Sequence, residues 1–159
     1  MCTEEGKVGC GGAIRGDGGE WLKGFSVQLE RCGVMEAEAW GVLVGLKLCR
    51  DMGFEKIEVE SDAKQVVDLL VQNKERCRYI HIFQEIHEMM QGDWQIKINH
   101  VFREGNRVAD KLAHLSLQIE SPRIIWDTPP PEVRSILEEE LAGTKFPRRV
   151  LSVCNGRVM

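Results

Sequence analysis

The spacing of apolar residues along this chain of 159 residues switches between two periods, and this switching restricts the fold more than any other feature. In residues 56–61 and 94–102, apolar and polar residues alternate, which is typical of β-strands with one buried face. In residues 35–50 and 79–91, apolar residues instead recur every three or four positions, as on one face of an α-helix. Strands and helices therefore alternate along the chain, which indicates an α/β fold.

The remaining segments complete this order. Residues 8–15 and 20–28 are separated by a glycine-rich turn and predict a hairpin. One helix follows Asp62 and runs to about residue 71, and a last helix follows Asn106. The order hairpin, helix, strand, helix, helix, strand, helix predicts a mixed β-sheet flanked by helices.

The composition changes after about residue 120, so we expect one domain over residues 1–119 and a C-terminal extension over residues 120–159. The extension contains a stiff break at Pro129–Pro131 and then a short acidic helix over residues 132–142. Residues 143–159 carry four basic side chains and no acidic one. This basic tail either contacts nucleic acid or is a disordered terminal extension.

The overall charge and the cysteines restrict the class of protein. With 21 basic and 25 acidic residues the net charge is -4, which argues mildly against a constitutive nucleic-acid binder, although a carboxylate metal site also makes a chain acidic. No apolar run reaches the ~20 residues of a membrane span, and the first residues lack the order of a signal peptide. The six cysteines form no CxxC pair, and the four histidines have no zinc-site spacing with them. We therefore expect reduced thiols in an intracellular protein, nuclear or cytoplasmic.

Three carboxylates stand where strands end or helices begin. Asp62 follows the strand at 56–61, and Glu38 and Asp110 fall in the first turns that we expect for two helices. If these side chains met, they would attract a hard divalent cation. The residues also have simpler explanations, because Asp62 would cap a helix and the other two would suit a helix dipole. For Glu58 and Glu60, on the same strand face as Asp62, a solvated face is the default.

Four segments, in order from about residue 8 to 118, resemble the ribonuclease H family and more narrowly the plant reverse-transcriptase-like ribonuclease H domains, many of them related to retroelements. Together these segments are specific, whereas any one of them alone would be weak. They are Gly11-Gly12-Ala13-Ile14-Arg15, Glu36-Ala37-Glu38-Ala39-Trp40, Val59-Glu60-Ser61-Asp62-Ala63 and the stretch from Arg103 to Ala113 that contains Asn106-Arg107-Val108-Ala109-Asp110.

The resemblance implies a hydrolase that cuts the RNA strand of an RNA–DNA hybrid with two Mg²⁺ ions held by four acidic residues. By the match, Glu38, Asp62 and Asp110 correspond to three of these acids. Asn106 begins the last motif, and we expect it to be the helix cap that aims Asp110. The partner would be an RNA–DNA hybrid or another nucleic acid, with no membrane involved.

The sequence departs from the family at its start. The family's first catalytic aspartate lies in an Asp-Gly pair on an opening strand that is central in the sheet, and no aspartate precedes Asp17 here. We therefore expect an N-terminally truncated fold in which Glu4 or Glu5 substitutes poorly for the aspartate. Residues 1–7 would at most partly fill the gap, and we do not expect residues 120–159 to replace the strand. Unpaired backbone groups would then lie in the core.

Basic residues near these motifs are candidates for substrate contacts. Arg103 and Arg107 flank the expected site and would meet phosphates. A second cluster lies between two helices, where a solvated loop is the simpler explanation, and consists of Lys74, Arg76 and Arg78. The family's histidine before the last helix is not evident. His100 is interpreted as a packed strand residue rather than a proton shuttle, and His114 lies one helical turn after Asp110, within contact distance.

Three functions remain open from the sequence. The chain is a Mg²⁺-dependent ribonuclease H, or a catalytically degenerate module of the same fold that holds nucleic acid or a protein. The acidic charge keeps a third hypothesis open, a protein-interaction domain that does not bind nucleic acid. The absent first aspartate favours the degenerate module. The sequence does not determine the oligomeric state.

Overall fold

The fold is that of a computed structural model that describes residues 6–30, 32–72, 80–143 and 150–156. Six strands and five α-helices alternate along these residues, with one short 3-10 helix, η1. In chain order they are β1 (Lys7–Arg15), β2 (Trp21–Glu30), α1 (Val34–Asp51), β3 (Lys56–Ser61), α2 (Lys64–Gln72), α3 (Ile80–Met90), β4 (Gln95–His100), η1 (Arg103–Gly105), α4 (Arg107–Ser116), β5 (Arg123–Trp126), α5 (Pro131–Gly143) and β6 (Val150–Gly156).

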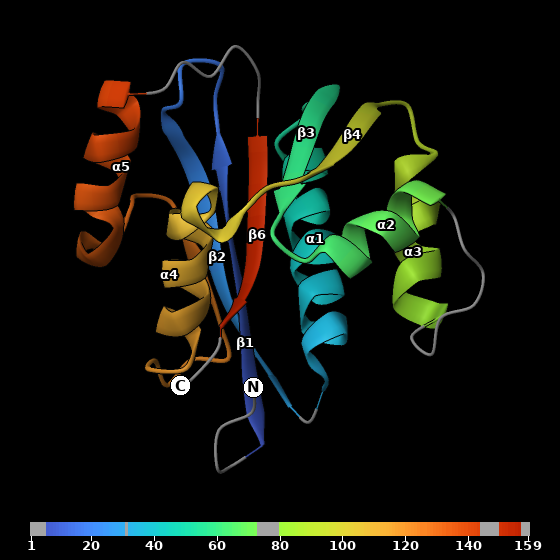
Figure 1. Cartoon of the computed structure of the whole chain (residues 1–159), viewed down its shortest axis with the longest axis horizontal. Coiled ribbons are helices and arrows are strands. Elements are labelled where there is room, and N and C mark those ends of the chain that lie inside the picture. The colour runs from blue at the N-terminus through green and yellow to red at the C-terminus, as the bar shows by residue number, and fades with distance from the viewer. Residues whose placement is uncertain (1–5, 31, 73–79, 144–149, 157–159) are drawn as a thin grey trace.

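All six strands belong to one mixed sheet with the order β4-β3-β6-β1-β2-β5. Figure 1 shows β6 between β3 and the hairpin of β1 and β2. β1 pairs antiparallel with β2 and with β6, whereas β3 pairs parallel with β4 and with β6. β5 is antiparallel to β2. The expected α/β class, with a mixed sheet and flanking helices, is confirmed.

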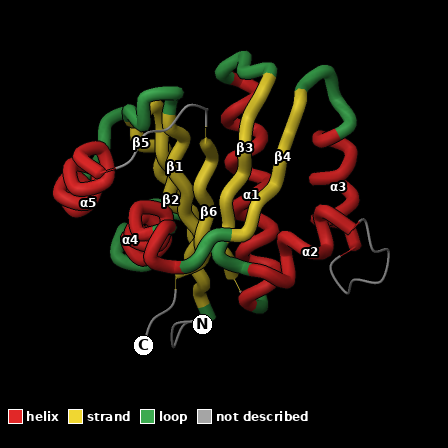
Figure 2. The backbone as a smooth tube through the Cα atoms, turned by 45° about the horizontal axis from the view of Figure 1, so that its top comes forward, coloured by secondary structure: helices red, strands yellow, loops and turns green. Residues whose placement is uncertain are grey.

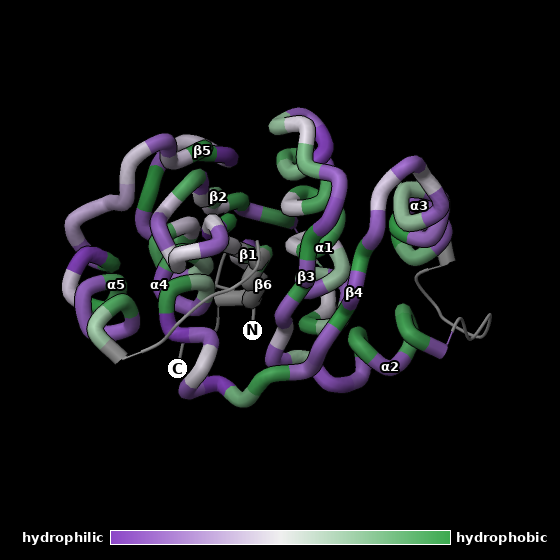
Figure 3. The backbone as a smooth tube through the Cα atoms, turned by 90° about the horizontal axis from the view of Figure 1, so that it is seen from above, coloured by the Kyte–Doolittle hydropathy of each residue, from purple (hydrophilic) through white to green (hydrophobic). Residues whose placement is uncertain are grey.

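The two faces of the sheet carry different helices, as Figure 2 shows. Along β1, Cys10 and Ile14 belong to the larger core, under α1, α2 and α3. Ala13 belongs to the smaller core with α4 and α5, so successive residues of β1 face opposite layers. We call these two sides the α1 face and the α4 face. Figure 3 shows the alternation of hydrophilic and hydrophobic residues along β3 and β4 that identified them as strands.

The central position between β1 and β3 is filled by β6, from the far end of the sequence. The expectation that the C-terminal extension does not replace the missing strand is therefore wrong. Leu151 is fully buried in the larger core. A side chain at Gly45 of α1 would collide with Leu151, so the glycine lets the helix approach the new strand closely. The backbone groups of β1 and β3 find partners on β6 instead of lying unpaired.

The other elements differ from expectation mainly at their ends. β3 has the expected bounds, and α5 is a helix that begins one residue earlier than expected, at Pro131, where a proline fits the first helical position. β5 was not expected, because four residues, Arg-Ile-Ile-Trp, are too few to show a period. Within the part of the chain that the structure describes, no helix is long and apolar enough to cross a membrane.

The thiols that the structure describes, Cys10, Cys32 and Cys49, are buried, and none of the three is in a disulfide. Burial raises the pKa of the Cys49 thiol to about 12. Burial is also the main cause that raises the pKa of Cys10, and the charge of Glu38 adds to it. Both groups stay protonated near neutral pH and are unreactive.

The expectation of a solvated carboxylate at Glu60 is wrong, because only 9% of this residue is exposed. Burial raises the pKa of Glu60, Arg15 opposes this shift, and Glu140 of α5 adds to it. A pKa that is higher in the folded state means that folding favours protonated Glu60. Its contribution to stability is therefore greatest in acid and is lost as the pH rises through the folded-state pKa.

We expect Glu60→Gln to raise the free energy of unfolding at pH 7, since it removes a buried charge while Arg15 keeps its ion pair with Glu140. The gain should shrink as the pH falls through the raised folded-state pKa of Glu60, and it should be absent below the ordinary glutamate pKa of about 4.3, where the wild-type carboxyl is protonated in both the folded and the unfolded state. Urea unfolding at a series of pH values measures this. The control is Glu138→Gln, which removes an exposed charge on α5. If the gain in the free energy of unfolding stays constant across the pH series, it does not come from the buried charge of Glu60.

Candidate functional site

Glu38 is a buried carboxylate at the end of β3. It lies in the second turn of α1, since the helix begins at Val34, and its side chain is 1% exposed. The prediction that it suits the first turn of a helix is therefore wrong, and Glu36 holds that place. The Ser61 hydroxyl donates a hydrogen bond of 3.4 Å to Glu38 Oε2 and accepts one of 3.1 Å from the Ala63 N–H. Ser61 therefore links Glu38 to the strand end.

Asp62 lies beside Glu38. Both residues line one open pocket of about 260 Å³, between the start of α1 and the start of α2, and Lys64 also lines it. The Asp62 side chain is 9% exposed, and its Oδ2 is 3.6 Å from Nε of Arg103. Arg103 remains 54% exposed. Two of the three predicted carboxylates thus share a pocket, with a half-exposed cation at Asp62.

Asp110 belongs to α4, the helix that packs on the α4 face of the sheet. It is in the first turn of α4, as expected, and it does not line the pocket of Glu38 and Asp62. Its neighbour is His114, whose Nδ1 is 3.6 Å from Asp110 Oδ1 and 2.8 Å from the Asp110 backbone oxygen. The predicted contact between these two residues is confirmed.

The three carboxylates do not form a metal-binding set. Among the residues that the structure describes, no group of three or more His, Cys, Asp or Glu side chains converges to hold a metal ion. The central strand β6, Val-Leu-Ser-Val-Cys-Asn-Gly, has no acidic residue to add. Two carboxylates and an arginine do not fit a pair of divalent cations, which need several oxygen ligands each.

Asn106 has the expected position but not the expected bond. It is the N-cap residue of α4, yet its side chain makes no capping hydrogen bond to the helix. Its backbone oxygen accepts the N–H of Asp110 at 3.1 Å. The amide is buried. The position of Asp110 therefore depends on the backbone of Asn106, and a role of its side chain at the site stays a prediction.

Two exposed rings lie next to Arg103, and sequence reasoning missed them as a pair. Phe102 is 76% exposed, and its ring packs edge-on against His100 at 5.5 Å between centroids. The expectation that His100 is packed inside is wrong, because the residue is exposed. β4 ends at His100, two residues before the alternation of apolar residues stops. The sequence does contain a signal for this exposed surface, because an aromatic residue follows the strand end and an arginine comes directly after it.

The other predicted basic residues are less available. Arg107 donates a hydrogen bond of 2.7 Å to Glu139 of α5, and this bond is the main cause that raises its pKa. Lys74, Arg76 and Arg78 lie outside the described residues.

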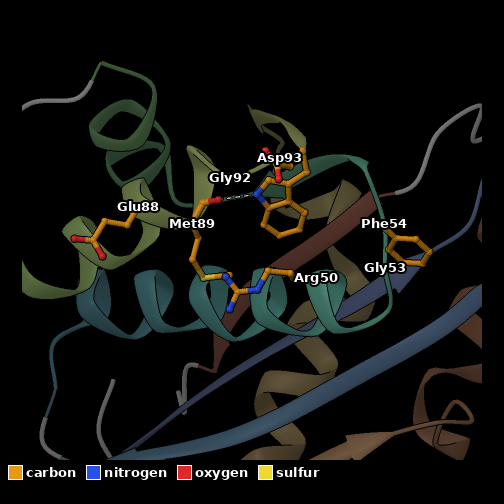
Figure 4. A pocket seen from close by; sticks show the side chains of 8 residues that line it. Arg50, Gly53, Phe54, Glu88, Met89, Gly92 and Asp93 are labelled. Carbon is orange, nitrogen blue, oxygen red and sulfur yellow. Dashed lines mark hydrogen bonds between the residues drawn. The ribbon is translucent and has the colours of Figure 1, made fainter.

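A second pocket, of about 310 Å³, lies where the C-terminal ends of α1 and α3 meet the start of β4 (Figure 4). The Trp94 indole N–H donates to the Met89 backbone oxygen at 2.6 Å. Trp94 and Arg50 both line this pocket. None of the predicted site residues lines this pocket.

Comparison with known proteins supports a fold and a family. Residues 2–116 match the family described as reverse transcriptase-like. A curated Arabidopsis thaliana protein named "Putative ribonuclease H protein" is 33% identical over 146 residues, which cover 91% of this chain but 24% of that protein. This chain therefore spans about a quarter of the length of the curated relative.

Two solved structures share the fold. RNase H1 from the archaeon Halobacterium salinarum superposes with a TM-score of 0.68 at 22% identity, covering 74% of this chain and 92% of that one. The N-terminal RNase H domain of Rv2228c from Mycobacterium tuberculosis gives a TM-score of 0.50 at 19% identity, covering 70% and 91%.

Proposed function

We propose that this chain, which belongs to the reverse transcriptase-like family of ribonuclease H-like domains, binds RNA–DNA hybrid or related nucleic acid without hydrolysing it. The observation that carries this proposal is the ion pair of Arg103 with Asp62 at the pocket of Glu38. The pair leaves a half-exposed guanidinium where the family holds metal ions. Guanidinium groups bind phosphate well, whereas two carboxylates alone repel it.

The surface beside Arg103 also suits nucleic acid. Phe102 is the most exposed of the large hydrophobic residues that the structure describes, and its ring packs edge-on against the His100 ring. Exposed rings stack on bases or sugars, and each stacked base contributes roughly 1–3 kcal/mol to binding. Lys64 adds a further exposed cation at the pocket. The cations would attract the phosphate backbone of a nucleic acid, and the rings would stack on its bases. Neither interaction needs a base-specific contact.

The test is fluorescence anisotropy with a labelled RNA–DNA hybrid at several salt concentrations. We expect Arg103→Ala to weaken binding and to lower the slope of log Kd against log salt by about one, as for one lost phosphate contact. Phe102→Ala should weaken binding at least about fivefold, since one stacking contact is lost. Lys47→Ala is the matched control, because Lys47 is also a half-exposed cation paired with a carboxylate, on α1.

Three outcomes would overturn parts of this proposal. Mg²⁺-dependent cleavage of the hybrid that disappears in Asp62→Asn would show an active ribonuclease H. Absence of salt-dependent binding would leave a protein-interaction domain. Equal losses in Arg103→Ala and Lys47→Ala would mean that binding does not depend on this pocket.

A further inference from the structure

Arg107 lies on the same turn of the chain as the exposed surface of Phe102 and Arg103. Arg103 begins η1, and Arg107 is the first residue of α4, which follows directly. The N-terminal end of a helix carries a partial positive charge, which favours a phosphate beside it. Asp110, the carboxylate of this first turn, lies against His114. Arg107 is therefore placed to add one phosphate contact to the surface that Phe102 and Arg103 form.

A carboxylate of α5 already occupies this arginine. Nη1 of Arg107 donates a hydrogen bond of 2.7 Å to Oε2 of Glu139. The side chain of Glu139 is 62% exposed and that of Arg107 is 45% exposed, so the pair is open to solvent. A phosphate group that binds Arg107 must therefore displace Glu139, and a rotation of the Glu139 side chain is enough for this. Exposed ion pairs of this kind are weak, so the displacement is easily reversed.

The helix that carries Glu139 is held in place by other residues. α5 lies beside α4 (Figure 2), and Val133 and Leu137 of α5 are buried in the smaller core that α4 shares. Glu140, the next residue after Glu139, forms an ion pair with Arg15, whose side chain is only 5% exposed. Because none of these contacts involves Glu139, a substitution of Glu139 should leave α5 where it is.

We infer that Glu139 lowers the affinity of this domain for nucleic acid by competing with phosphate for Arg107. A carboxylate and a phosphate both accept hydrogen bonds from the same guanidinium N–H groups, so only one of them binds there at a time. α5 comes after residues 2–116, the part of the chain that matches the family, so the competing group lies outside that match. The inference rests on the proposed function in taking nucleic-acid phosphate as the group that Glu139 excludes.

The test compares Glu139→Gln with the wild type by fluorescence anisotropy, with the labelled RNA–DNA hybrid at low salt. We expect Glu139→Gln to bind about two- to fivefold more tightly, since an exposed ion pair no longer has to be broken. The gain should shrink as salt is added, because salt screens charges at the surface. Glu138→Gln is the matched control, because it removes the same charge from an exposed position one residue earlier on α5.

A double-mutant cycle separates this competition from the general loss of a negative charge. With Arg107→Ala present, Glu139→Gln should tighten binding no more than Glu138→Gln does. Arg107→Ala should also weaken binding more in the Glu139→Gln protein than in the wild type, because only there is the arginine unoccupied. An equal effect of the two glutamine substitutions on hybrid affinity would overturn the inference. A gain from Glu139→Gln that is undiminished by Arg107→Ala would overturn it too.

A second probe keeps this result separate from the proposed function. Inorganic tripolyphosphate has the phosphate charges without bases or sugars, and its binding is followed through the NMR signal of the Arg107 side-chain Nε–H. If no variant binds the hybrid, the proposed function is wrong, and tighter tripolyphosphate binding by Glu139→Gln than by Glu138→Gln still supports the competition. Equal tripolyphosphate binding in that case overturns both. If the hybrid binds both variants equally, the inference alone is wrong.

Discussion

Leu151→Ala should lower the free energy of unfolding by about 2–5 kcal/mol, as for other leucines removed from a packed core. Leu151 is fully buried, and it belongs to the core under α1. A domain of this size has a total stability of about 5–15 kcal/mol, so the loss is a large part of it. Urea unfolding followed by circular dichroism measures the change.

The control is the same substitution at Leu141 of α5, which is 46% exposed. Leu141→Ala should change the free energy of unfolding by about 0.5 kcal/mol or less. If the two variants lose the same stability, β6 does not lie at the centre of the sheet.

Gly11→Ala should destabilise the domain by about 1–3 kcal/mol, the usual cost of forcing a methyl group into a packed interior. Its Cβ would lie 2.7 Å from the carbonyl carbon of Leu112 and collide with the backbone N of Ala113. Backbone atoms of a helix cannot rotate away as a side chain can, so α4 must move off the sheet. Asp110 on the same helix would move with it.

Gly105→Ala is the control for Gly11→Ala. No heavy atom lies within 4 Å of a Cβ built at Gly105. This variant should be neutral or more stable by up to about 1 kcal/mol, because alanine restricts the unfolded chain. Thermal unfolding of both variants distinguishes a packing effect from the general effect of adding a methyl group. A Gly11→Ala protein as stable as Gly105→Ala would show that α4 does not rest on β1.

Local patterns predicted most of the fold. The alternation in Lys56–Ser61 and the spacing of Ala39, Val42 and Leu46 come from contacts that each element makes along a whole face, so they appear in the sequence. β6 could not be predicted in this way. Its place between β1 and β3 depends on pairing with residues about 90 and 140 positions away. The sequence of residues 150–156 contains no pattern that identifies either of these partner strands.

The candidate site was predictable residue by residue but not in its arrangement. Glu38, Asp62 and Asp110 were identified by resemblance, and the structure brings only the first two into one pocket. The pairing of Arg103 with Asp62 and of Arg107 with Glu139 depends on how helices and loops pack together. The exposure of Phe102 follows from where β4 stops, and sequence alternation locates strand ends only to within a few residues.

The place of β6 also bears on the order in which the protein is made. During synthesis β1 and β3 emerge first, and each presents an unpaired edge until residue 156 has left the ribosome. Such open edges pair readily with other chains. The sheet is completed when β6 pairs with β1 and β3, which are far away in the sequence. Contacts between distant residues form slowly during folding. We therefore expect a nascent chain that stops before residue 150 to depend on chaperones, and the released chain to gain its protease resistance in one late step.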